Sequence, residues 1–341
     1  MTKKMKPVAD WKKLVQKYQC PHLGRALWQC ANTLGPILGF WVALYFLFPI
    51  SWLASIILAA LSGLFHVRAF IIFHDCGHGS FFKNKKANDA LGFLTGILTF
   101  TPYNHWKWEH AVHHATNGDL DKRGIGDVWT MTVEEYITSS RRIKLSYRLL
   151  RNPLILFGLA PLFLFFVLER IPSSQCKPRE RRSVYLMNFT LILYGIAMSL
   201  VFGFIPWLIL QTVMMGVAGG CGIWLFYVQH QFEDTYWAQG KEWDFTAAAM
   251  EGSSYYRLPK IMQWFSGNIG FHHIHHLNPM IPNYNLEKCH HSDPFFQIAP
   301  ELNLLSSLKT IRFRLWDEAN QKMISFGDLK RQLAEEELKA A

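Results

Sequence analysis

Two long stretches of the chain contain no charged residue. Residues 26–67 and 183–232 lack Lys, Arg, Asp and Glu altogether. A helix crosses the hydrocarbon core of a bilayer in about 20 residues, so each stretch is long enough for two crossings. Turn-forming residues interrupt the first stretch at 49–51 and the second at 203–206. The pattern therefore predicts an all-α integral membrane protein with two transmembrane helical hairpins, whose spans lie at about 31–49, 52–73, 185–204 and 206–228.

Two shorter uncharged stretches, 90–104 and 152–168, are marginal for a full crossing because they hold only about 15 to 17 residues. If the histidine-rich segments at 74–114 and 272–276 lie on one side of the membrane, an even number of crossings separates them. The second hairpin supplies two crossings, so the short stretches either both cross or both lie in the interface. We expect both to be interfacial or re-entrant.

The distribution of basic residues predicts the orientation of the chain in the membrane. The net charge is +10, and only 18% of the 341 residues are charged, against about 25% in a typical soluble domain. Basic residues gather near the N-terminus, including Lys3, Lys4 and Lys6, and in the segment 74–184, whereas the hairpin turns have none. Because Lys and Arg collect on the cytoplasmic side, we expect one multi-pass domain, 1–341, in the plasma membrane, with both termini inside. Its cytosolic cap comprises 74–184 and 229–341, and no nucleic-acid partner is expected.

A basic run follows in the middle of the predicted cap, and it most simply marks the anionic inner leaflet. The run consists of Arg141, Arg142, Lys144, Arg148 and Arg151. The six cysteines are scattered without a CxxC pair, so in a cytoplasm-facing protein we expect free thiols.

Eight of the fifteen histidines fall into three short clusters on the predicted inner side. Helix positions i, i+3 and i+4 share a face, so HxxxH aims two imidazoles at one point and HxxHH aims three. A single HxxxH is more often an ordinary surface feature, but three clusters together predict a metal site. Eight nitrogen ligands are too many for one ion and suit two. The predicted ligands are His74, His78, His110, His113, His114, His272, His275 and His276.

The donor set narrows the choice of metal. Imidazole suits Zn, Cu, Fe and Ni, but structural Zn usually takes four ligands with thiolates among them. The Glu-x-x-His pairs of ferritin-like di-iron bundles are absent. Two irons in a nitrogen-rich shell can activate dioxygen, which suits an enzyme that attacks an unactivated C–H bond beside a bilayer.

Several residues outside these clusters have a chemical interpretation. His230 ends the last predicted span at the level of His74 and His78, and we expect it to be a ninth ligand rather than an interfacial histidine. Metal-bound histidines usually donate their other N–H to an acceptor. Asp75, Asp127 and Asp234 could provide that acceptor, with helix capping or surface ion pairs as an equal alternative. We expect His273 to pack or hydrogen-bond, and His105, His290 and His291 to lie at the surface.

The segments HDCGHGSFF, WEHAVHHATNGD and GNIGFHHIHHLNP resemble the three histidine boxes of the membrane fatty-acid desaturases. Flanking stretches are similar to bacterial acyl-lipid desaturases, especially delta-5 enzymes, and the resemblance runs from about residue 25 to 320. It implies iron ligands at the eight clustered histidines, a di-iron centre, O2 as oxidant and a helical hairpin stem under a cytosolic cap. It also implies electrons from a ferredoxin or flavodoxin, because no cytochrome-b5-like HPGG motif is present. The basic run could then also dock an acidic ferredoxin.

The expected activity is insertion of a cis double bond, delta-5 by resemblance, into a saturated phospholipid acyl chain. The histidine spacing fits a hydroxylase of the same superfamily equally well, although the flanking sequences favour desaturation. A membrane metal transporter or sensor would line its spans with polar or charged groups, and the uncharged stretches offer only His66 and the adjoining Arg68. Nothing in the sequence indicates an oligomeric state.

Overall fold

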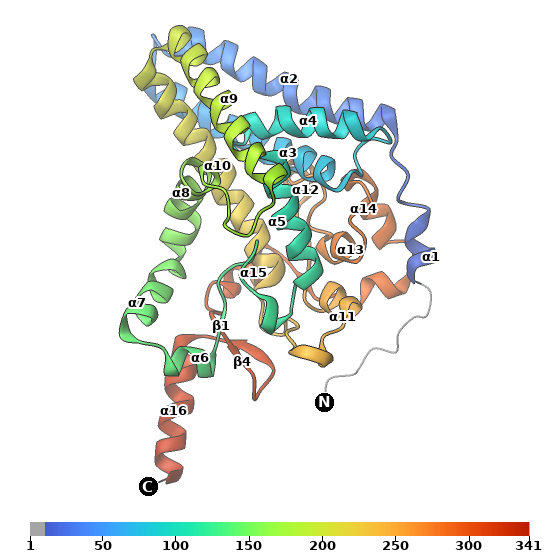
Figure 1. The fold of residues 1–341 in the computed structure, drawn as a ribbon, viewed down its shortest axis with the longest axis vertical. Coiled ribbons are helices and arrows are strands. Elements are labelled where there is room, and N and C mark those ends of the chain that lie inside the picture. The colour runs from blue at the N-terminus through green and yellow to red at the C-terminus, as the bar shows by residue number, and fades with distance from the viewer. Residues whose placement is uncertain (1–10, 341) are drawn as a thin grey trace.

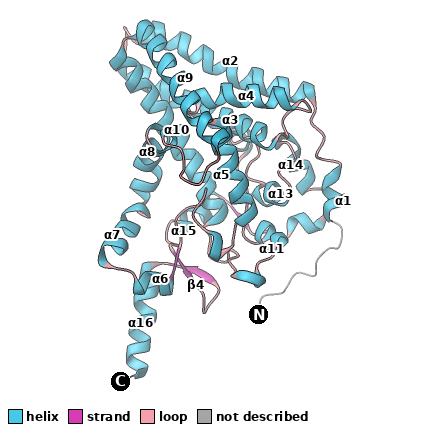
Figure 2. Cartoon of the chain, in the orientation of Figure 1, coloured by secondary structure: helices cyan, strands magenta, loops and turns pink. Residues whose placement is uncertain are grey.

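The computed structural model describes residues 11–340 and is mostly helical, with very little sheet (Figure 1, Figure 2). Lys3, Lys4 and Lys6, on which the predicted cytoplasmic placement of the N-terminus depends, lie outside the described residues. Four helices are long and apolar enough to cross a membrane, in agreement with the predicted all-α membrane fold. They are α2 (Leu23–Leu47), α3 (Trp52–His78), α9 (Pro178–Phe202) and α10 (Phe204–His230).

The helices extend beyond the predicted spans at the ends that approach the cap. α2 begins at 23 rather than 31, α9 begins at 178 rather than 185, and α3 continues to 78 rather than 73. The hydrophobic pattern marks only the apolar part, whereas backbone hydrogen bonds carry a helix on into polar sequence. Ser51 caps the start of α3 by accepting from the Ala54 amide, and Gly79 ends it with φ 76°, a left-handed conformation that suits glycine.

The two hairpins pack through a close contact between α3 and α10. A Cβ added at Gly63 would lie 2.7 Å from Val217 Cβ and 2.8 Å from the Met214 carbonyl oxygen, so only glycine allows this approach. At the far end of the hairpins, the Phe202 ring lies 5.2 Å from the Trp41 ring and 6.0 Å from the Tyr45 ring. Both hairpin turns therefore lie at the same end of the molecule (Figure 1).

The two short uncharged stretches form bent helical segments. Residues 90–104 cover the end of α4 (Lys85–Leu98) and the start of α5 (Tyr103–Thr116), and α4 has 14 residues, fewer than the about 20 of a full crossing. Residues 152–168 cover η2 (Ile155–Leu159), α8 (Ala160–Phe166) and the start of η3 (Leu168–Arg170). This run is bent by 62° from α7 (Arg141–Leu150). An interfacial or re-entrant position for both stays a prediction.

The rest of the described chain forms the cap of short helices and two small sheets. β1 pairs with β4 in parallel, β4 pairs with β5 in antiparallel, and β2 pairs with β3 in parallel. Its helices are α1 (Trp11–Gln16), η1 (Leu120–Lys122), α6 (Val133–Thr138), η4 (Gly240–Glu242), α11 (Phe245–Met250), α12 (Lys260–Phe265), α13 (His272–Leu277), α14 (Asn283–His290), η5 (Pro294–Gln297), α15 (Leu304–Thr310) and α16 (Phe326–Ala340). Its strands are β1 (Met131–Thr132), β2 (Tyr255–Tyr256), β3 (Glu301–Leu302), β4 (Leu315–Asp317) and β5 (Lys322–Ile324).

Candidate metal centre

Four helices bring nine histidines together where the long helices meet the cap. α3 carries His74 and His78 in its last five residues, and His230 is the last residue of α10. α5 and α13 each carry three histidines at HxxHH spacing, which places them on one side of a helix. All nine predicted ligands thus lie in one region. They divide into two groups.

The first group, which we call the five-histidine group, comprises His74, His78, His110, His114 and His275. Their ligand nitrogens all lie within 4.8 Å of one another. The Nε2 atom of His74 lies 3.0 Å from Nε2 of His275, and Nε2 of His114 lies 3.1 Å from Nε2 of His110.

The second group, the four-histidine group, comprises His113, His230, His272 and His276. The ligand nitrogens of His113, His230 and His276 lie within 4.8 Å of one another. His272 joins them, with its Nε2 atom 2.9 Å from Nε2 of His230 and 3.2 Å from Nε2 of His276. The two groups are adjacent, because the rings of His114 and His276 stack with centroids 4.2 Å apart.

Burial favours the neutral form of five of these imidazoles, which lie on α5 and α13. Their pKa values lie well below the ordinary value, because burial disfavours the charged form and neighbouring imidazoles repel a second charge. These histidines are His110, His114, His272, His275 and His276. Neutral imidazole is the form that binds metal ions.

Unpartnered nitrogens show that the groups fit metal ions. Nε2 of His78, in the five-histidine group, and Nε2 of His113, in the four-histidine group, are buried and have no hydrogen-bond partner in the described chain. A buried nitrogen without a partner is costly unless a ligand satisfies it. Nine buried or half-buried imidazoles in two compact groups suit two transition-metal ions.

Two of the three predicted aspartate acceptors contact these histidines. With its proton on Nδ1, His74 donates to Asp75 Oδ1 at 3.2 Å, and His113 donates to Asp127 Oδ1 at 2.6 Å. The His230 Nδ1 atom donates to the Gly252 carbonyl oxygen at 3.1 Å. These bonds fix each ring so that Nε2 faces its group.

The third prediction of this kind, Asp234, is wrong. Its side chain is exposed and contacts no histidine in the described part of the chain. The reason is the turn that follows α10, where the Glu233 carbonyl oxygen accepts from the Met323 amide of β5 at 2.8 Å. This pairing holds the chain beside β5, and the Asp234 side chain is exposed to solvent.

Two histidines that the sequence placed at the surface are buried. His105 is covered by the segment after η3, where the Ser173 amide donates to its Nε2 atom at 3.1 Å. Its Nδ1 atom lies 3.5 Å from Glu109 Oε2, and burial raises the pKa of Glu109 to about 7. His290 is buried against the rings of Tyr255 and Phe271, and its Nδ1 atom lies 3.1 Å from Nε2 of His273. Covering segments of this kind leave no spacing signal in the sequence.

The predictions for the neighbouring histidines hold. His273 is fully buried and donates from Nε2 to the Phe296 carbonyl oxygen at 2.9 Å, and His291 is exposed.

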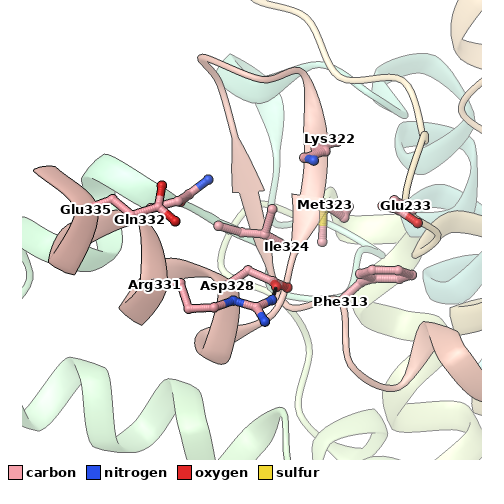
Figure 3. Close-up of a pocket in the computed structure, with 9 residues that line it drawn as sticks. All are labelled: Glu233, Phe313, Lys322, Met323, Ile324, Asp328, Arg331, Gln332 and Glu335. Carbon is pink, nitrogen blue, oxygen red and sulfur yellow. Dashed lines mark hydrogen bonds and ion pairs between the residues drawn. The ribbon is translucent and has the colours of Figure 1, made fainter.

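A polar pocket of about 230 Å³ lies elsewhere in the cap, between β5 and α16 (Figure 3). It contains no histidine, and its charged side chains include the ion pair of Arg331 with Asp328. It lacks the converging nitrogen atoms that mark the two histidine groups. The candidate site is therefore the pair of histidine groups.

Comparison with known proteins identifies the family of the chain. A family model described as fatty acid desaturase matches residues 50–300. The chain is 45% identical over 319 residues to a fatty acid desaturase of Bacillus subtilis, covering 93% of this chain and 90% of that protein. It is 28% identical to the sn-1 oleoyl-lipid 12-desaturase of Synechocystis sp., covering 76% and 73%. It is 27% identical to the sn-1 acyl-lipid omega-3 desaturase (ferredoxin) of that organism, covering 79% and 74%.

Proposed function

The chain belongs to the fatty acid desaturase family, and from this premise we propose that it desaturates the acyl chains of membrane phospholipids. In the proposed reaction, a saturated methylene pair loses two hydrogens and becomes a cis double bond. O2 accepts these two hydrogens together with two electrons from a separate donor and two protons from water, and two water molecules are the by-product. The observation that carries the proposal is the pair of buried histidine groups at the ends of α3 and α10.

We assign two iron ions to the two histidine groups. Bound iron supplies the O2 activation and one-electron chemistry that removal of hydrogen from an unactivated methylene requires. The chain's own part is geometric. Asp75, Asp127 and the Gly252 carbonyl oxygen hold three rings with Nε2 facing inward, and burial keeps bulk water away from the site.

The position of the site supports a lipid substrate. Both groups lie at the ends of helices long enough to cross the bilayer, so an acyl chain can reach them without leaving the membrane. Holding one carbon pair beside the metal ions is worth a large rate factor. Two of the relatives are named for acyl-lipid substrates, which supports the same substrate class here.

We propose delta-5 as the bond position, from the resemblance of the flanking sequences, and a ferredoxin or flavodoxin as donor. One relative is named with ferredoxin. The exposed side chains of Arg141, Arg142, Arg148, Arg181 and Arg182 favour a cytoplasmic cap in the plasma membrane. Reporter fusions test this orientation: one at Arg181 should report the cytoplasm and one at Ser51 the outside, and the reverse pattern would refute it.

The decisive experiment is expression of the chain in a bacterium that lacks desaturases, followed by fatty-acid analysis with double bonds located by mass spectrometry. We expect a product that has lost the mass of two hydrogens and has its double bond at carbon five. A product that gained the mass of one oxygen would identify a hydroxylase instead. His113→Ala, expressed at the same level, should abolish the product, and unsaturation at the wild-type level in that variant would refute the metal assignment.

A further inference from the structure

Arg151 is buried, contrary to its expected place beside the inner leaflet. Its side chain is 3% exposed, and it forms no ion pair with a carboxylate in the described part of the chain. A buried positive charge without a counter-ion is costly, so its contacts must compensate. Arg148, one turn earlier on α7, is exposed as expected.

The guanidinium group of Arg151 joins three separate segments. Its Nη2 atom donates to Gln231 Oε1 at 2.8 Å and to the Phe313 carbonyl oxygen at 2.9 Å, and its Nη1 atom donates to the Trp129 carbonyl oxygen at 3.4 Å. It also lies 5.2 Å from the ring centroid of Tyr227 on α10. A positive charge is favourable here, because the carbonyl groups at the C-terminal end of α10 carry partial negative charge.

Two of these segments adjoin the four-histidine group. Gln231 directly follows His230, and Trp129 lies two residues after Asp127, which accepts from His113. The segments also meet at the Thr130 hydroxyl, whose single proton is shared between the Val128 carbonyl oxygen at 3.0 Å and the same Gln231 oxygen at 3.3 Å.

The C-terminal end of the 127–130 loop, at Thr130, is also held by a contact that does not involve Arg151. Arg123 donates to the Thr130 carbonyl oxygen at 2.7 Å and forms an ion pair with Glu135 at 2.6 Å. The main effect of Arg151 is therefore to hold this loop and the end of α10 in a fixed position relative to each other. Neither segment contains a member of the five-histidine group.

We propose that Arg151 is a positioning residue for the four-histidine group. It holds His113 through the loop that carries Asp127, and it holds His230 through Gln231. It therefore sets the metal affinity of this group and leaves the five-histidine group unaffected. The inference rests on the proposed function only in that the two groups bind metal ions.

The test uses the full chain in lipid nanodiscs, loaded with Fe²⁺ without oxygen and then mixed with a coloured chelator. Two release phases are expected, one for each histidine group, and His230→Ala identifies the phase of the four-histidine group. Loss of a residue that orients metal ligands typically costs about 10- to 100-fold in affinity. Arg151→Met should accelerate the four-histidine phase about tenfold and leave the other phase unchanged.

Matched variants separate positioning from general stabilisation. Arg148→Met, three residues earlier and on α7, should change neither phase, and Arg151→Lys should restore part of the slow release because it keeps the charge. Thr130→Val removes one hydroxyl and keeps Arg151, so it should accelerate the same phase by a smaller factor. Thr130→Val decides the question if Arg151→Met does not fold.

Several results would overturn the inference. Equal acceleration of both phases with a lower unfolding temperature would make Arg151 a general structural anchor. If Fe²⁺ release is unchanged in both Arg151→Met and Thr130→Val, the positioning role of Arg151 is refuted, and the proposed metal assignment is not affected. A wild-type chain that retains no Fe²⁺ would overturn this inference together with the proposed metal assignment.

Discussion

The aspartate beside each histidine group provides a quantitative test of the proposed centre. We predict that Asp127→Asn weakens metal binding at the four-histidine group and hardly changes the stability of the protein. His113 donates from Nδ1 to Asp127 Oδ1 at 2.6 Å, a short bond to a charged acceptor. The other carboxylate oxygen accepts only a 3.4 Å bond from the exposed Gly124 amide. An asparagine at this position can still accept from His113 through its neutral amide oxygen. Loss of the weak bond from Gly124 should cost little.

The size of the effect follows from the strength of that bond. Hydrogen bonds to charged groups contribute about 1.5–3 kcal/mol net, against about 0.5–1.5 kcal/mol for neutral pairs. Because the His113 ring is then held less firmly, the substitution should weaken metal binding by about 1–2 kcal/mol, which corresponds to about a 5- to 30-fold loss of affinity.

Asp75→Asn should behave differently. Asp75 accepts from His74 with one oxygen and from the Asn283 amide and side chain with the other, at 2.7 and 2.8 Å. Asparagine has one acceptor oxygen, so it cannot serve both sides. We expect this variant to lose about 1–3 kcal/mol of unfolding free energy in addition to metal affinity at the five-histidine group.

The assay is Fe²⁺ release to a chelator together with the unfolding temperature of the metal-free chain. Asp234→Asn is the matched control, because Asp234 is exposed and contacts no histidine in the described chain. Release from Asp127→Asn at the rate of Asp234→Asn would show that the carboxylate does not orient His113. Equal losses of stability in the Asp127 and Asp75 variants would refute the distinction between them.

Three further predictions concern other parts of the chain. His230→Ala should reduce bound iron from two ions to one and abolish turnover, and retention of both ions with normal turnover would make His230 only an interfacial residue. Gly63→Ala should lower the unfolding free energy by about 1–3 kcal/mol through overpacking against α10. Gly39→Ala should not lower it, because no atom lies within 4 Å of an added Cβ there and alanine favours the helix. Equal unfolding temperatures of the two variants would contradict the close contact. Burial raises the pKa of Glu169 to about 8, so the folded chain binds this proton more tightly than the unfolded chain. Stability should therefore fall as the pH rises from about 4.5 to about 8, and Glu169→Gln, measured by thermal unfolding across that range, should flatten the decline.

The features that the sequence predicts well depend on local spacing. The spans are visible because a bilayer excludes charge over about 20 residues. The HxxxH and HxxHH clusters are visible because helical periodicity alone places their side chains on one face. His230 lies outside the clusters, but it could be placed because it ends α10 near the level at which His74 and His78 end α3.

The features that the sequence misses depend on contacts between distant segments. Arg151 belongs to a run of basic residues that are otherwise largely exposed, and only its contacts with Gln231 and the Phe313 carbonyl oxygen show that it is buried. Asp127 and Asp234 have equal merit as sequence candidates, and the direction of a single turn after α10 separates them. His105 is buried by a segment 68 residues away along the chain.

The division of the histidines also indicates what sets the spacing of the two groups. α3 supplies only the five-histidine group, and α10 supplies only the four-histidine group, whereas α5 and α13 each supply both. Within α5 and α13 the relative placement is fixed by the helix itself, because HxxHH sets neighbouring side chains at constant angles. The remaining freedom is the separation of α3 and α10, and the contact at Gly63 limits that separation inside the membrane-spanning part. The packing of two membrane helices therefore helps to set the distance between the proposed metal sites in the cap.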